Sequence, residues 1–416
     1  MTSFFIETDE CAHTVADAER MAGLLKQAQF EPVQTMEDAD VVILVSCHDA
    51  GGNILFTRLE NLKTKYPYKI LIIAGCIAQA DLAKAKKYSW VGTWQIHRIV
   101  EAVEEALHDS HLHLRGADEM PPLDLPKIRL NPLLEIIPLS RECFGFCAFC
   151  KTRKTGKIES YPVADIVTAA RKAVEEGVQQ IWLTSHDTMS YGLDIKTHLG
   201  QLLKELVSVP GNFKIKVGKG NPAHFPRIKD DVIPWFAHDK MFKLVHLPFY
   251  DENTAGDGQE FVAIVDEFRE KIPHITIAMD IMIGHPTETE DTYWKKLELL
   301  KKTNPDELTL SRFAPKPKTP DAKLPPLAEE IVSHRFKVLT DVFQNISKMN
   351  NERWLDWEGE ISIDAQGREE RQWVGRNFAY KPVIVEGNYK MGDIHKVRII
   401  QATTFDLRGR VINELG

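Results

Sequence analysis

The stretch Arg141-Glu-Cys143-Phe-Gly-Phe-Cys147-Ala-Phe149-Cys150 places three cysteines within eight residues. It follows the apolar run Leu133–Pro138, which we expect to be a strand. Three thiolates at this spacing can point at one centre, and thiolates suit zinc or an iron–sulfur cluster. A structural zinc site is normally closed by four ligands, and no fourth cysteine lies nearby. The spacing therefore favours a four-iron cluster with one open iron, which can hold a substrate.

The chain after this stretch alternates short apolar runs with helical patterns up to about residue 350. Six strand–helix units predict a partial (β/α)6 barrel, smaller than the full eight-fold version. The cysteine loop would then lie at the carboxyl mouth of a barrel strand, where barrel enzymes place their chemistry. A final helix, Leu327–Met349, would lead out of the barrel. The expected strands are Leu133–Pro138, Gln180–Thr184, Lys214–Gly218, Lys243–Leu247, Thr276–Ile283 and Glu307–Phe313, with helices such as Val163–Glu176 and Thr289–Lys302 between them.

Residues 1–108 form a second alternating region, for which we predict a doubly wound, mostly parallel sheet. The runs Val41–Val45 and Ile70–Ala74 are continuously apolar, which is typical of strands buried on both faces. Residues 109–132 are polar and contain four prolines, so we expect a linker there. The barrel domain would then cover residues 133–350.

The other three cysteines, Cys11, Cys47 and Cys76, each closely follow an apolar strand of this first region. In a parallel sheet all three would lie at the carboxyl edge, where such sheets bind ligands. Three thiolates at one edge could hold a second iron–sulfur cluster, and the alternative is three buried core cysteines.

Residues 353–416 change character and predict a small all-β barrel. From Arg371 onward, eight lysines and arginines face four acids, a local charge of +4, with Trp373, Phe378 and Tyr380 among them. Basic groups can contact phosphate and aromatic rings can stack on bases, so RNA binding is one interpretation. A solvated barrel face over core aromatics is the other. The expected strands are Glu360–Ile363, Gln372–Val374, Pro382–Val385, Lys396–Ile400 and Arg408–Ile412.

The whole chain has 416 residues, 43% hydrophobic residues and a formal net charge of −8. These values exclude a wholly disordered chain and argue against a protein that coats nucleic acid by bulk charge. No apolar run is long enough to span a membrane, and the first residues do not resemble a signal peptide, so we expect a cytoplasmic protein. Six cysteines in a large intracellular protein are not expected to form a disulfide framework.

The spacing Cys143-x3-Cys147-x2-Cys150, with Phe149 before the last cysteine, resembles the radical S-adenosylmethionine superfamily. The resemblance implies that these cysteines hold a [4Fe–4S] cluster whose open iron binds S-adenosylmethionine. An electron from the cluster would cleave this cofactor to methionine and a 5′-deoxyadenosyl radical. Further cofactor contacts are expected from Phe149, Ser185, His186, Lys216, Asn221 and His246.

The order of domains and cysteines resembles the methylthiotransferase family over nearly the whole chain. The segments that begin at Cys11, end at Cys47 and surround Cys76 resemble the family's three N-terminal cysteine segments. The resemblance implies a second [4Fe–4S] cluster on these cysteines. Val374-Gly-Arg376-Asn377 and Leu407-Arg408-Gly409 resemble the family's RNA-binding module, a TRAM-like barrel, and imply substrate contacts from Arg376 and Arg408.

Two further segments, Cys150-Lys-Thr-Arg-Lys-Thr-Gly156 and Ile181–Thr188, resemble the archaeal and eukaryotic branch of that family. This branch acts on N6-threonylcarbamoyladenosine in tRNA. The implied reaction inserts a methylthio group at C2 of that base, next to the anticodon. The implied partners are tRNA and an external electron donor, and the sulfur donor stays open.

Several strand-end positions depart from the family pattern, among them His186, Lys219, Gly220 and His285. Two alternatives therefore stay open. One is methylthiolation of a different acceptor, a protein or a small molecule, by a divergent paralogue. The other is an iron–sulfur RNA-binding protein without turnover.

Overall fold

The structure is a computed structural model that describes residues 1–9, 11–47, 52–76, 82–114, 116, 120–144, 158–249, 258–315 and 319–412. Its contacts divide the chain into two compact units. The first consists of Met1–Pro132 with Ile136–Arg141, and the second of Leu133–Glu135 with Glu142–Gly416. The predicted domain boundaries at 108, 133 and 350 stay predictions.

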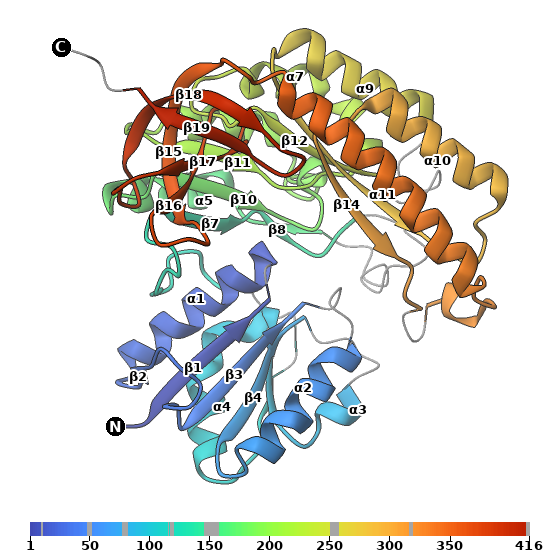
Figure 1. Ribbon diagram of the computed structural model, residues 1–416. Coiled ribbons are helices and arrows are strands. Elements are labelled where there is room, and N and C mark those ends of the chain that lie inside the picture. Colours follow the sequence, from blue (N-terminus) through green and yellow to red (C-terminus); the bar gives the residue numbers. More distant parts are fainter. Residues whose placement is uncertain are drawn as a thin grey trace. The chain divides into compact units, whose positions relative to one another are not determined.

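The first unit contains a six-stranded sheet in the order β2-β1-β3-β4-β5-β6, and all of its paired strands are parallel (Figure 1). This confirms the predicted parallel N-terminal domain. The strands are β1 (Ser3–Thr8), β2 (Glu31–Pro32), β3 (Val41–Ser46), β4 (Ile70–Gly75), β5 (Ser89–Gly92) and β6 (His113–Leu114). The helices are α1 (Ala12–Gln27), α2 (Gly52–Lys65), α3 (Leu82–Ala85), the 3-10 helix η2 (Thr93–Arg98) and α4 (Ile99–Leu107).

The central strands of this sheet are buried on both faces, which explains their continuous apolar runs. In β3, Val41 and Ile43 pack in a core that also contains residues of α1 and α4. The intervening residues Val42 and Leu44 pack in a second core with residues of α2. Because successive side chains of a strand point to opposite faces, one strand supplies both cores.

The second unit begins with parallel strands that form two three-stranded sheets, β11-β10-β7 and β12-β13-β14. Between β11 and β12 the described ladder is reduced to one isolated bridge, from Ile215 to Met241. All six strands lie where the sequence predicts them, and the division between the two units falls within β7. They are β7 (Leu134–Pro138), β10 (Gln180–Thr184), β11 (Lys214–Val217), β12 (Leu244–Phe249), β13 (Thr276–Ile283) and β14 (Glu307–Arg312).

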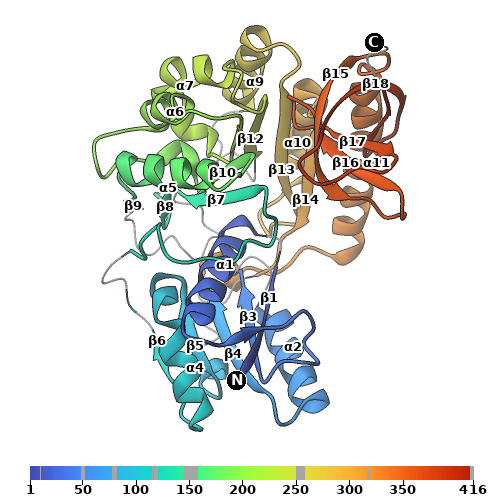
Figure 2. The ribbon, with the colours of Figure 1, turned by 90° about the vertical axis from the view of Figure 1, so that its left-hand side faces the viewer.

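Helices line the outer side of these strands, as Figure 2 shows for α6, α7 and α9. Along β10, β11 and β12, buried aliphatic residues alternate with the half-buried side chains of Trp182, Lys216 and His246. The second face of the strands is therefore polar. The helices are α5 (Val163–Glu175), α6 (Leu199–Val207), α7 (Lys229–Phe236), α9 (Gly258–Lys271), α10 (Glu290–Thr303) and α11 (Glu329–Glu352), with the short elements β9 (Glu159–Ser160), η4 (Thr188–Ser190), η5 (Pro222–Arg227) and η6 (Asp321–Lys323). The short strand β8 (Ser140–Arg141) belongs to the first unit.

The last part of the second unit is a closed five-stranded barrel in the order β15-β16-β17-β19-β18, which confirms the predicted all-β barrel. Its core contains Ile361, Val383 and Val397. The strands are β15 (Glu358–Gln366), β16 (Gln372–Arg376), β17 (Pro382–Glu386), β18 (Ile394–Ala402) and β19 (Leu407–Val411).

One loop of this barrel, residues 377–381, docks at the amino ends of β12, β13 and β14. The amide of Lys243 donates to the carbonyl of Phe378 at 2.8 Å, and Thr276 Oγ1 donates to the carbonyl of Ala379 at 2.7 Å. The buried ammonium of Lys381 lies 3.0 Å from the carboxylate of Asp306. The barrel thus covers the end of the strands opposite to their carboxyl ends. In the part of the chain that the structure describes, none of the helices combines the length and apolar character needed to cross a membrane.

Candidate functional site

The cysteines of the first unit follow three neighbouring strands, β1, β3 and β4, whose carboxyl ends are level. Thr8 pairs with Val45, and Val45 pairs with Ala74. Each cysteine comes within three residues of this row, and all three are half-buried. The structure therefore brings Cys11, Cys47 and Cys76 to one edge of the sheet, as the sequence predicts.

Cys11 and Cys47 are in direct contact, and Cys11 is also the N-cap residue of α1. A hydrogen bond with the Cys47 thiol lowers the pKa of the Cys11 thiol to about 6, although burial opposes this shift. Hydrogen bonds from the amides of Thr14 and His13, in the first turn of the helix, lower the pKa further. The Cys11 sulfur is therefore biased toward the thiolate, which is the form that binds metals.

The donor chemistry of this edge fits an iron–sulfur cluster, because two facing thiols and a third on the next strand end are the ligands such clusters use. Among the described residues, however, no three histidine, cysteine, aspartate or glutamate side chains form a ready-made site for a single metal ion. The assignment of Cys11, Cys47 and Cys76 as cluster ligands stays a prediction.

The second cysteine set is described only at its start. Cys143 is half-buried and follows β8, whereas Cys147, Phe149 and Cys150 lie outside the described residues. Glu142, immediately before Cys143, has a left-handed backbone with φ of 64°. The ring of Phe144, immediately after it, lies 6.3 Å from the ring of His224.

Asp187 organises the strand-end loops after β10 and β11. Its Oδ1 accepts the amide of Asn221 at 2.7 Å, and its Oδ2 lies 2.6 Å from Nδ1 of His224. The hydroxyl of Ser185 accepts the amide of Asp187 at 3.2 Å. The predicted residues Ser185 and Asn221 are thus brought together around a buried carboxylate, whose partner His224 lies near Phe144.

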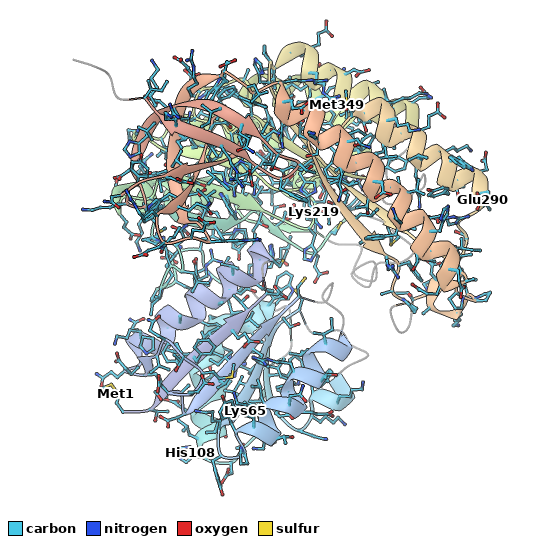
Figure 3. The ribbon with its side chains drawn as sticks, in the orientation of Figure 1. Met1, Lys65, His108, Lys219, Glu290 and Met349 are labelled. Carbon is cyan, nitrogen blue, oxygen red and sulfur yellow. The ribbon has the colours of Figure 1, made fainter. Side chains whose placement is uncertain are left out.

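A second histidine–carboxylate pair lies on β12 and β13. Nε2 of His246, a predicted residue, is 2.7 Å from Oδ1 of the buried Asp280. Lys219, labelled in Figure 3, follows β11, and its ammonium is 3.9 Å from Oδ2 of Asp280. The amide of Gly220 donates to the carbonyl of His246 at 3.0 Å, which holds the loop after β11 against β12.

Lys216, also predicted to contact the cofactor, lies between two aromatic rings. Its ammonium lies 4.1 Å from the ring centre of Trp182 and 4.2 Å from that of Tyr380, in the C-terminal barrel. Burial lowers the pKa of Lys216 to about 8, and the nearby carboxylate of Glu307 opposes this shift. This residue joins the two parts of the second unit.

The remaining predicted residues differ in their surroundings. His186 is half-buried in the loop after β10. Arg376 is bound internally, because its Nε lies 3.3 Å from Asp364 and its guanidinium stacks 4.6 Å from the ring centre of Tyr380. The Arg408 side chain is 46% exposed on the barrel surface, so of the two predicted substrate-binding arginines it is the more accessible.

Three site residues were not among the predicted set: Asp187, His224 and Asp280. Asp280 had a visible signal, because it is a lone acid within the apolar run Thr276–Ile283. A buried acid in a strand needs a partner, and partners of this kind often mark sites. Asp187 and His224 had no comparable signal, because their pairing joins loops that follow different strands.

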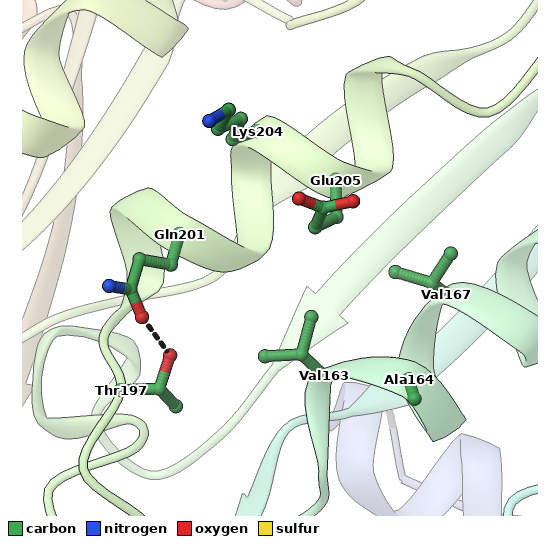
Figure 4. Close-up of a pocket in the computed structure, with 7 residues that line it drawn as sticks. All are labelled: Val163, Ala164, Val167, Thr197, Gln201, Lys204 and Glu205. Atoms are coloured by element: carbon green, nitrogen blue, oxygen red, sulfur yellow. Dashed lines mark hydrogen bonds between the residues drawn. The ribbon is translucent and has the colours of Figure 1, made fainter.

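A surface hollow of about 560 Å³ lies between α5 and α6 (Figure 4). It is lined by Val163, Ala164, Val167, Thr197, Gln201, Lys204 and Glu205. None of the predicted site residues belongs to it, so it is separate from the strand-end chemistry.

Comparison with family models gives two matches. Residues 3–92 match the Uncharacterized protein family UPF0004, and residues 358–412 match the TRAM domain. The first match contains the three N-terminal cysteines, and the second coincides with the closed five-stranded barrel. The TRAM match confirms the predicted TRAM-like module.

Curated relatives match nearly the whole chain. The probable threonylcarbamoyladenosine tRNA methylthiotransferase of Methanothermobacter thermautotrophicus is 32% identical, with 96% of this chain and 97% of that protein covered. The threonylcarbamoyladenosine tRNA methylthiotransferase of Drosophila melanogaster is 33% identical over 99% of this chain and 78% of that protein. The Homo sapiens protein of the same name is 31% identical over 99% of this chain and 74% of that protein.

Among solved structures, a radical S-adenosylmethionine methyltransferase, TsrM, from Kitasatospora setae aligns with a TM-score of 0.50. The identity is 12%, with 75% of this chain and 73% of that chain covered, so the likeness concerns the fold. The relatives from an archaeon and from animals confirm the family expected from the sequence. The chain belongs to the threonylcarbamoyladenosine tRNA methylthiotransferase family, and its fold is similar to that of a radical S-adenosylmethionine enzyme.

Proposed function

We propose that this protein inserts a methylthio group at C2 of N6-threonylcarbamoyladenosine in tRNA, next to the anticodon. The observation that carries this proposal is the match, over 96% or more of the chain, to relatives named for that base and for tRNA. A match over nearly the whole chain extends across the regions that contain both cysteine sets and the C-terminal barrel, which supports the proposal.

The proposed cofactors are two [4Fe–4S] clusters and S-adenosylmethionine. Cys11, Cys47 and Cys76 would hold one cluster, and Cys143, Cys147 and Cys150 the other. When bound, these groups supply a radical that removes hydrogen from a carbon atom and a methylated sulfur that takes its place. The external electron donor and the sulfur donor would be separate molecules.

The protein's own contribution is to position groups and to select the tautomers of two histidines. The carboxylate of Asp187 favours the tautomer of His224 with its proton on Nδ1, and so fixes the ring beside Phe144. Asp280 holds His246 in the same way through Nε2. Ser185, His186, Asn221 and His246 follow or lie on strands at this polar face, and we propose that they contact the cofactor.

The tRNA is proposed to bind the C-terminal barrel. Arg408 and Arg410 lie exposed on β19, and Arg398 pairs with Arg410 across the ladder between β18 and β19. Like charges directly opposite each other on two strands are unfavourable, and the carboxylate of Glu358, 3.0 Å from Arg398, offsets part of this charge. A phosphate backbone would pair with the exposed arginines of β19.

The test of the acceptor is mass spectrometry of tRNA nucleosides from cells with and without this gene. We expect 2-methylthio-N6-threonylcarbamoyladenosine to disappear without the gene and to return with the intact gene. A Cys143→Ala gene is the matched control and should not restore it. An unchanged 2-methylthio fraction would refute the proposed acceptor.

The number of clusters is tested by iron and sulfide analysis of protein prepared without oxygen. Two [4Fe–4S] clusters predict about eight iron and eight sulfide per chain. Replacing Cys11, Cys47 and Cys76 by Ala should leave about four of each and spare 5′-deoxyadenosine formation. A value near four in the unchanged protein would remove the second cluster.

A further inference from the structure

Asp9 lies between β1 and α1, and its carboxylate contacts both cysteines that face each other at this edge. Oδ2 accepts the amide of Cys47 at 2.6 Å, and Oδ1 accepts the amide of Cys11 at 3.2 Å. The hydroxyl of Thr14 also donates to Oδ1. One side chain therefore joins the ends of β1 and β3, which are separated by nearly forty residues of sequence.

Two explanations for this arrangement can be compared. An acid before a helix can simply satisfy amides of the first turn, and the bonds from Cys11 and Thr14 fit that role. The bond from Cys47 does not fit it, because Cys47 follows a different strand and its amide makes the shorter contact. Hydrogen bonds to a carboxylate are stronger than neutral ones, so this contact fixes the two strand ends relative to each other.

We infer that Asp9 is a positioning residue of the N-terminal cysteine site, which sets the spacing of Cys11 and Cys47 and adds negative charge beside them. The inference rests on the cluster proposed for these cysteines. The spacing should determine how well the site takes up iron. The charge should lower the reduction potential of the bound cluster, because local charge and hydrogen bonding at the ligands set that potential.

Asp9 also determines which acceptor the amides of Cys11 and Cys47 bind, and this affects the reduction potential. Amides next to cluster ligands commonly donate toward sulfur, and such bonds raise the reduction potential. Here the carboxylate takes the amides of both Cys11 and Cys47. Both effects of Asp9, its charge and its capture of these donors, shift the potential in the same direction.

The experiment uses the full chain with Cys143, Cys147 and Cys150 replaced by Ala, so that only the N-terminal site can hold iron. Asp9→Asn keeps an oxygen acceptor and removes the charge, whereas Asp9→Ala removes both. Glu7→Gln is the matched control, because Glu7 carries the same charge two residues earlier on β1 and pairs with Arg58 instead, at 2.9 Å. Each variant is analysed for iron and sulfide and for the midpoint potential of its cluster.

We expect Asp9→Asn to keep its iron and to shift the midpoint potential upward, and Asp9→Ala to lose iron several-fold. Glu7→Gln should change neither quantity. Iron content and potential equal to the parent in both Asp9 variants would overturn the inference, as would an equal shift in Glu7→Gln. If the parent, which lacks the second cysteine set, bound no iron, both this inference and the N-terminal cluster would be overturned. Analysis of the modified tRNA nucleoside tests only the proposed acceptor, so the two failures can be told apart.

Discussion

Replacing Lys216 by Met tests whether the column of Trp182, Lys216 and Tyr380 carries a buried charge. The ammonium lies between two rings, about 4 Å from each ring centre. Attraction to the rings favours the charged form, whereas loss of water disfavours it. The lowered pKa means that the loss of water is the larger effect. Met keeps a flexible apolar chain between the rings and removes the charge.

The magnitude follows from the pKa of Lys216, which is about 8 in the folded protein against 10.5 for an ordinary lysine. A difference of about 2.5 pH units corresponds to about 3.4 kcal/mol. Below pH 8 Lys216 is protonated in both the folded and the unfolded protein, so the full free-energy cost of burying the charged ammonium destabilises the folded state. Between pH 8 and 10.5 the folded state releases the proton first, so the free energy of unfolding rises with pH across this window.

The assay is urea unfolding of the parent and the variant at pH 7.5 and pH 10. Other groups that titrate in this range, Lys243 among them, contribute to both proteins and cancel in the comparison. Because the two pH values cover only part of the titration window, we expect the rise in unfolding free energy between them to be about 2.4 kcal/mol smaller in Lys216→Met. The control is Lys204→Met, which removes an exposed lysine from α6. Equal pH dependence in Lys216→Met and the parent would refute the reasoning.

Three further substitutions test other parts of the structure. Arg141→Met removes the buried guanidinium that lies 3.1 Å from the carboxylate of Asp17. It should lower the unfolding free energy, measured by denaturant titration, by about 3–5 kcal/mol, and a loss below 1 kcal/mol would contradict this prediction. Glu288→Gln leaves the buried Lys296 and Arg335 without the carboxylate that they share and should lower the unfolding free energy by a similar amount. The melting temperature should fall below that of Glu298→Gln, a control at an exposed glutamate. Arg408→Gln should reduce the slope of log affinity for tRNA against log salt by about 1, and an unchanged slope would exclude a phosphate contact.

The elements that sequence predicts well are those whose signal is local. The runs Val41–Val45 and Ile70–Ala74 are apolar throughout because helices cover both faces of the sheet, and each run is a strand in the structure. The shared edge of Cys11, Cys47 and Cys76 follows from the same logic, since parallel strands end on one side.

Features that depend on distant parts of the chain could not be predicted in this way. The alternation in β11 places Lys216 on the same face as Trp182, but nothing near it indicates that Tyr380 closes the other side. Asp9 likewise stands beside Cys11 in sequence, and only the folded sheet brings the amide of Cys47 to it. The break between β11 and β12 could not be predicted from the apolar pattern either. Each strand is still paired on one edge, β11 with β10 and β12 with β13, so both keep the pattern of an ordinary strand.

The loop at residues 377–381, which caps the amino ends of β12, β13 and β14, has a consequence for synthesis on the ribosome. The amide of Lys243 and the hydroxyl of Thr276 find their acceptors only in residues made more than a hundred positions later. Until then Phe242 and Leu244, at the amino end of β12, cannot pack against Tyr380. The nascent chain must therefore carry an unfinished catalytic domain until residues 377–381 have left the ribosome, a period in which exposed apolar surface favours aggregation. A chain that stops before residue 377 would stay in that state.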